Sequence, residues 1–147
     1  LEMGYSHVLV SEECSDRQIL QMGNNFYRQT SQAAPLIKRI YGRRRMMIMK
    51  HCPINTNLSD GQRKHCSLCH RDRYELVCDS FRLYCRGNQE CMMELYEEKP
   101  VDRIAKIPMY QEQGIKAFFI DFLDETEQEK EKIRMRCKEA MAPFDFD

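Results

Sequence analysis

The chain has 147 residues, 42% of them hydrophobic and 31% charged, which is typical of one globular domain with its own core. Its 23 basic and 23 acidic residues cancel, so it lacks the strongly basic field of a general nucleic-acid-binding domain. No apolar run approaches the roughly 18 residues that span a bilayer, and we therefore expect no membrane partner.

The amino-terminal sequence predicts the compartment. It has neither the charged region nor the apolar stretch of a signal peptide. Eight cysteines without such a signal indicate a reducing, cytoplasmic location, where clustered thiols bind metal more often than they form disulfides. A disulfide-bonded secreted domain is the alternative. Leu1–Gly4 resembles the end of a helix, so we expect a fragment of a longer protein.

The first elements predict a βα repeat. Tyr5–Val10 is short and apolar, as in a buried strand, and a helix capped by Ser15 then runs to about Arg28. A second strand is expected at Leu36–Tyr41 and a third, short and apolar, at Met46–Met49. Strand, helix and strand at this spacing are typical of parallel α/β sheets and barrels. The expected core positions of the helix are Ile19, Leu20, Met22, Phe26 and Tyr27.

Three consecutive arginines, Arg43–Arg45, lie between the second and third strands. They could contact phosphate or RNA, but a solvated turn is the simpler interpretation.

Residues 51–98 form a cysteine-rich insertion that holds six of the eight cysteines. Asp60-Gly61 predicts a turn, and the strands Tyr74–Cys78 and Phe81–Cys85 predict a small β-hairpin. Cys78 and Cys85 are interpreted as packing residues rather than ligands. An extended segment from Cys91 to Tyr96 follows.

The insertion contains a predicted metal site. Cys66 and Cys69 form a C-x-x-C turn, which directs two thiolates to one metal, and Cys52 and Cys91 can complete a four-thiolate set. Such a set fits a four-iron–four-sulfur cluster or tetrahedral zinc. A mixed site is an alternative, as are unligated buried cysteines. The histidines available for a mixed site are His51, His65 and His70.

The last third predicts a helix over Val101–Gln113 closed by Gly114, a strand over Ile115–Phe122, and a helix from Thr126 to about Met141. In a βα barrel, residues at the carboxyl ends of strands face the active site. The carboxylates in such places are weak candidates for catalytic groups, and caps are the simpler interpretation. They are Glu12 and Glu13 after the first strand, and Asp121 and Asp124 after the last.

Several segments resemble, in order, the collagenase-like peptidase family U-32. Tyr41-Gly42-Arg43, Met47 and Cys52-Pro53 are similar to the family's YGR-x-x-x-M-x-x-x-x-C-P segment. The C-x-x-C turn, Cys91 and the Ile120-Asp121-Phe122 ending follow the same order.

The resemblance implies a fold and two activities. The fold is a TIM-like α/β barrel, of which this chain is the second half and the remaining half of the barrel a partner. One activity is that of a peptidase acting on a peptide substrate. The other is oxygen-independent hydroxylation of tRNA or a quinone precursor, with an iron–sulfur cluster on Cys52, Cys66, Cys69 and Cys91. A non-enzymatic, zinc-stabilised module that binds RNA or protein remains a further alternative.

Overall fold

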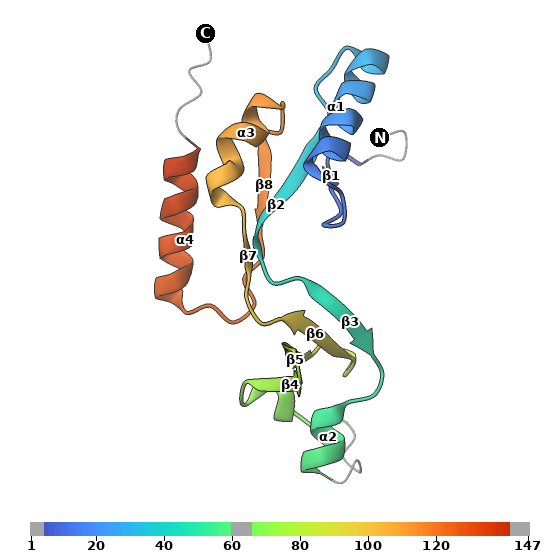
Figure 1. The fold of residues 1–147 in the computed structure, drawn as a ribbon, viewed down its shortest axis with the longest axis vertical. Coiled ribbons are helices and arrows are strands. Elements are labelled where there is room, and N and C mark those ends of the chain that lie inside the picture. The colour runs from blue at the N-terminus through green and yellow to red at the C-terminus, as the bar shows by residue number, and fades with distance from the viewer. Residues whose placement is uncertain (1–4, 60–65, 142–147) are drawn as a thin grey trace. The chain divides into compact units, whose positions relative to one another are not determined.

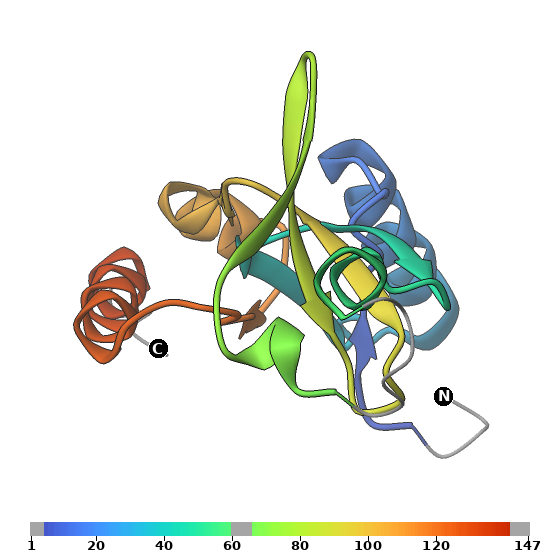
Figure 2. The same ribbon diagram turned by 90° about the horizontal axis from the view of Figure 1, so that it is seen from below.

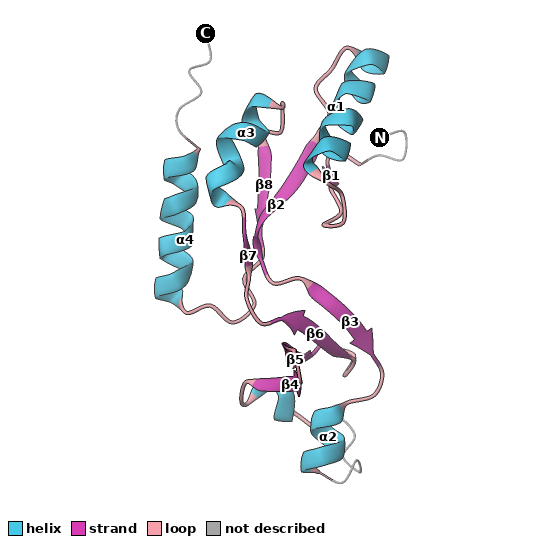
Figure 3. Cartoon of the chain, viewed as in Figure 1, coloured by secondary structure: helices cyan, strands magenta, loops and turns pink. Residues whose placement is uncertain are grey.

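The computed structural model describes residues 5–59 and 66–141. The chain forms two compact units, one from Leu1–Gly42 with Val101–Asp147 and the other from Arg43–Pro100, called unit 1 and unit 2. Together the described residues form a mixed α/β protein with two sheets and four α-helices, and they do not close a barrel (Figures 1 and 3). The predicted Asp60-Gly61 turn, His65 and the helix end at Leu1–Gly4 lie outside these residues.

Unit 1 is built on the strand β2 (Leu36–Gly42). The strands β1 (Val8–Leu9) and β8 (Ala117–Ile120) pair parallel to β2 on its two sides, and β7 (Val101–Asp102) pairs antiparallel with its end. The helix α1 (Asp16–Thr30) connects β1 to β2, which confirms the predicted strand–helix–strand repeat. β1 is shorter than predicted, because only Val8 and Leu9 pair with β2.

Two helices of unit 1 begin as their sequences predict. Ser15 caps α1 and Thr126 caps α4 (Glu127–Ala140), each in a capping box with the residue three positions later. Each hydroxyl accepts the N–H of that residue at 3.3 Å. Local side-chain chemistry therefore sets both helix starts.

The segment from Val101 to Gln113 is not the single predicted helix. It contains β7, a short 3-10 turn η2 (Ile104–Lys106) and the helix α3 (Ile107–Glu112). Pairing with β2 keeps the first residues extended, and Asp102 then accepts the Ile104 N–H at 3.1 Å. The helix starts beside Pro108, a residue that favours a first turn. Gly114 follows with φ 84°, as predicted for a closing glycine.

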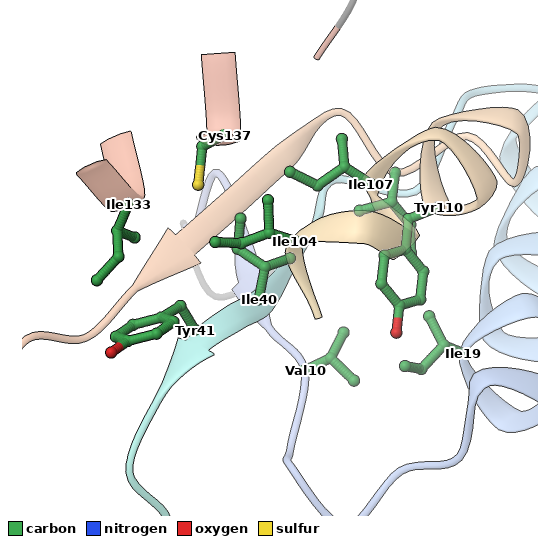
Figure 4. Packing of buried hydrophobic residues seen from close by; sticks show 10 residues of the cluster. Val10, Ile19, Ile40, Tyr41, Ile104, Ile107, Tyr110, Ile133 and Cys137 are labelled. Carbon is green, nitrogen blue, oxygen red and sulfur yellow. The ribbon is translucent and has the colours of Figure 1, made fainter. Parts of the chain in front are cut away.

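The core of unit 1 gathers side chains from α1, α3, α4 and the sheet (Figure 4). Ile107 and Tyr110 of α3 are completely buried there. Of the core positions predicted for α1, Ile19 is buried, whereas Leu20, Met22 and Tyr27 are exposed. The amphipathic pattern correctly predicts the helix, but fewer of its apolar side chains are buried than the pattern indicates.

Unit 2 is an antiparallel sheet in the order β3-β6-β5-β4, with two short helical segments. The predicted hairpin is confirmed, because β4 (Tyr74–Cys78) pairs antiparallel with β5 (Phe81–Gly87) and projects as a two-stranded ribbon (Figure 2). β3 (Arg45–Met49) and β6 (Met93–Glu97) complete the sheet. The helical segments are α2 (Pro53–Leu58) and the 3-10 turn η1 (Leu68–His70). The predicted insertion 51–98 lies within unit 2.

The three arginines at the start of unit 2 contact groups of its own sheet. Arg44 pairs with Glu97 at 3.1 Å and Arg45 with Glu94 at 2.8 Å. Arg43 donates to the Glu97 carbonyl at 3.3 Å and lies over the Tyr84 ring. These contacts favour a structural role over a phosphate site. Among the described helices, none combines the length and apolarity needed to cross a membrane.

Candidate metal centre

Cys52 lies at the start of α2, and its sequence neighbour explains its geometry. Pro53 occupies the first turn of the helix and restricts Cys52 to an extended backbone, with φ −106° and ψ 100°. The Cys52 thiol is the helix cap, because its Sγ accepts the Asn55 N–H at 3.3 Å. The Cys-Pro dipeptide therefore holds one half-buried sulfur in a fixed direction.

Cys66 and Cys69 are brought together by the η1 turn. The His70 N–H donates to the Ser67 carbonyl at 3.1 Å, and the Arg71 N–H to that of Leu68 at 3.0 Å. Both cysteines are half-buried. The predicted C-x-x-C segment thus forms a tight turn within unit 2.

The Cys69 thiol is affected by burial, by a backbone N–H and by the charges of two other cysteines. Burial raises the pKa of this thiol, the Gly87 N–H counteracts this by donating to Sγ, and the charges of Cys52 and Cys66 raise the pKa further. Cys52 and Cys69 also pack against one buried cluster, formed by Ile54, Cys85, Met93 and Leu95. Cys52 and Cys69 therefore pack on the same core of unit 2, and the charge of Cys66 acts on Cys69.

Cys91 differs from the other three. It is exposed, has a positive φ of 57°, and lies in the turn between β5 and β6. Asn88 shapes that turn, since its carbonyl accepts the Cys91 N–H at 3.1 Å and its side chain accepts the N–H groups of Glu90 and Met92.

The two cysteines interpreted as packing residues differ from each other. Cys85 is buried in the cluster behind Cys52, as predicted. Burial raises the pKa of the Cys85 thiol, and the charge of Cys52 acts in the same direction. Cys78 is exposed at the end of the hairpin, so the packing role predicted for it is wrong.

The described ranges 5–59 and 66–141 contain no ready-made group of three histidine, cysteine or carboxylate side chains placed for a metal. His51 and His70 are exposed. The donor set itself fits a soft metal, because thiolates suit zinc and iron–sulfur clusters and two of the sulfurs accept backbone N–H groups. Binding would require the thiols of Cys52, Cys66 and Cys69 to close on one centre.

The strand-end carboxylates form a separate polar cluster in unit 1. Glu12 Oε1 lies 3.4 Å from Arg39 Nε, and Asp121 Oδ2 lies 3.0 Å from Arg39 Nη2. Glu12 Oε2 is buried and has no hydrogen-bond partner among the described residues. Glu13 is exposed, and nothing places it in this cluster. The carboxyl ends of β1 and β8 thus meet at one arginine of β2.

Sequence reasoning missed the two charged residues in the middle of β2. Lys38 is 1% exposed, and its ammonium lies 5.9 Å from the centre of the Tyr110 ring. Burial lowers the pKa of Lys38 and the charge of Arg103 adds to this, while Asp16 and Glu12 oppose it. A Lys-Arg pair inside the apolar run LIKRIY was the available signal.

Comparison with known proteins adds no identification. The chain matches no protein-family model, no curated protein and no solved structure.

Proposed function

We propose that unit 2 holds a metal centre on the thiolates of Cys52, Cys66, Cys69 and Cys91. The observation that carries the proposal is the packing of Cys52 and Cys69 on a single small core, where each accepts a backbone N–H and where the charges of Cys52 and Cys66 act on Cys69. Backbone donors of this kind stabilise a thiolate and orient it toward a metal.

The proposal favours a four-iron–four-sulfur cluster within an α/β enzyme of the U-32 type. The β1-α1-β2 repeat and the parallel pairing of β8 with β2 support half of a TIM-like barrel, because parallel strands joined through helices are the repeating unit of such barrels, and the antiparallel β7 stands outside that pattern. When bound, the cluster supplies one-electron chemistry. Oxygen-independent hydroxylation of tRNA or a quinone precursor is the activity that such a centre would serve. A peptidase activity would instead draw on the carboxylates around Arg39.

One observation favours a second candidate, a zinc-stabilised module that binds RNA or protein. Among the described residues of unit 2, the hydrophobic cluster has four buried members with partly buried side chains around them, and small cores commonly need a metal to remain folded. Structural zinc contributes its binding free energy to folding.

The experiment is anaerobic purification of the full-length protein, followed by iron, sulfide and zinc analysis and visible spectroscopy. Iron and sulfide with broad visible absorption support the cluster, whereas a colourless protein with zinc supports the second candidate. Protein that binds neither metal contradicts the metal centre. Cys69→Ser should lose the metal, and the matched control Cys78→Ser, which alters an exposed cysteine outside the ligand set, should retain it.

The fourth ligand requires two further variants. Cys91→Ser should reduce metal content, and Cys85→Val, which keeps a buried apolar side chain of similar size, should not. If Cys85→Val instead reduces the metal content and Cys91→Ser does not, the fourth ligand is Cys85 and not Cys91.

The peptidase alternative is tested with gelatin or a peptide mixture. Its support is lost if cleavage survives separate replacement of Glu12, Asp121 and Cys69.

A further inference from the structure

The last residue of β5, Gly87, has no backbone reason to be glycine. The described glycines with positive φ are Gly42 and Gly114, and Gly87 is not one of them. Gly87 is buried in the middle of unit 2 and pairs with Met93 of β6. The reason for a missing side chain must therefore lie in what surrounds it.

The sulfur of Cys69 occupies the space where a side chain at residue 87 would lie. A Cβ built on Gly87 would lie 2.6 Å from Cys69 Sγ and 3.7 Å from Cys69 Cβ. The first distance is far shorter than any ordinary contact between carbon and sulfur, and the second is an ordinary van der Waals contact. Only the sulfur atom, therefore, requires glycine at this position.

The hydrogen-bond pattern between β5 and β6 explains why the Gly87 amide is available to this sulfur. The next amide, that of Asn88, donates to the Met92 carbonyl at 2.9 Å on the β6 side. Because successive amides along a strand point to opposite sides, the Gly87 N–H points toward the β4 side. The pairing of β4 with β5 ends at Tyr74, opposite Cys85, and Cys69 Sγ accepts the Gly87 N–H beyond that point.

We propose that Gly87 is a positioning residue of the thiolate centre, whose bare backbone seats Cys69 Sγ and whose amide donates to it. This inference rests on the proposed function. A hydrogen bond from backbone to sulfur holds a ligand in one rotamer and stabilises its negative charge. In an iron–sulfur centre, such bonds to sulfur also help to set the reduction potential.

The metal test compares Gly87→Ala with Gly23→Ala. A Cβ at Gly23, within α1, would meet no atom within 4 Å, which makes it the matched control. The probe is Co²⁺, titrated into each full-length protein while the sulfur-to-cobalt charge-transfer band is followed. Gly87→Ala should bind Co²⁺ about 10- to 100-fold more weakly and with an altered band, as is typical when a residue that contacts a metal ligand is changed. Unchanged affinity and spectrum in Gly87→Ala would overturn the inference.

A double-mutant cycle on the metal-free protein distinguishes the loss of this contact from a general loss of stability. Gly87→Ala should lower the urea midpoint in the Cys69 background and leave it unchanged in the Cys69→Ala background, because Cys69→Ala removes the clashing sulfur. An equal loss in both backgrounds would overturn the contact. Wild-type protein that binds no Co²⁺, zinc or iron would instead overturn the proposed function, and with it the role of Gly87 at a metal.

Discussion

The hydrogen bond between Tyr110 and Asp16 should be a measurable part of the stability of unit 1. Tyr110 is completely buried, and its hydroxyl donates to Asp16 Oδ1 at 3.0 Å. Lys106 Nζ lies 3.2 Å from the other carboxylate oxygen. Tyr110→Phe removes the hydroxyl and leaves the ring packing, so the variant isolates the hydrogen bond between α3 and the first turn of α1.

The magnitude follows from the surroundings of the carboxylate. A hydrogen bond to a charged group contributes about 1.5–3 kcal/mol when no water replaces it. The Asp16 side chain is 36% exposed, so water can replace part of the lost donor. We therefore expect Tyr110→Phe to lower the free energy of unfolding by about 1–2 kcal/mol at neutral pH.

The pH dependence has a defined sign at its acidic end. Burial alone would raise the pKa of Asp16, but the hydrogen bonds from Tyr110 and Lys106 and the charges of Lys106 and Lys38 outweigh it and lower the pKa below 3.8. The ionised carboxylate therefore stabilises the fold above its unfolded pKa, and this contribution is lost as the pH falls through the folded pKa. The difference between wild type and Tyr110→Phe should shrink in acid.

At alkaline pH the stability depends on the titration of Tyr110 and falls as the pH rises. Burial, followed by the hydrogen bond and charge of Asp16, raises the pKa of Tyr110 to about 12 from an ordinary 10.0. The stabilisation by the neutral phenol is complete below pH 10 and is lost as the pH rises from there toward 12. Tyr110→Phe cannot show this alkaline loss.

The assay is urea unfolding followed by far-ultraviolet circular dichroism at several pH values, with the slope checked for constancy. Tyr27→Phe is the control, because Tyr27 is 60% exposed and should behave as wild type. A loss in Tyr110→Phe below about 0.5 kcal/mol, the range of ordinary surface changes, would refute the reasoning, as would a loss that does not vary with pH.

Three further predictions concern other parts of the chain. In metal-loaded protein, Cys69→Ala should lower the thermal midpoint more than Cys137→Ala, because metal binding contributes to folding and Cys137 lies outside the candidate site; equal midpoints would count against the metal site. Thr126→Ala should cost about 1 kcal/mol in urea unfolding by removing the cap of α4, and an unchanged midpoint would mean that the capping box contributes nothing. Ile107→Ala should cost about 2–5 kcal/mol, because it opens a cavity at a completely buried position. Met135→Ala, at a half-exposed position, should stay within about 0.5 kcal/mol, and equal losses for these two variants would contradict the assignment of the core.

Local chemistry made several elements predictable. Ser15 and Thr126 begin their helices because a hydroxyl followed three residues later by Gln or Glu satisfies backbone groups within one turn. The β4–β5 hairpin was predictable because two short apolar strands flank a polar Asp79-Ser80 pair. These signals act over a few residues, so they can be read without knowing the rest of the fold.

Exposure was less predictable, because it depends on which surfaces distant segments cover. Leu20 and Tyr27 share an apolar pattern with Ile19, yet only Ile19 is buried by the core of unit 1. The segment after Val101 was predicted to be helical, but pairing with the end of β2 keeps it extended. Tertiary contacts outweigh local propensity at both places.

From the sequence alone it was predictable that Cys66 and Cys69 share one turn and that Cys52 precedes a helix-starting proline, because these signals lie within a few residues of each other. Only the tertiary structure shows that Cys91 is exposed on a turn, whereas Cys52 and Cys69 pack beside the core of unit 2. It alone placed the Gly87 backbone against Cys69 Sγ and brought Glu12 and Asp121 to Arg39. These contacts join residues far apart in sequence, and strand pairing and helix packing set their distances, which no local spacing encodes.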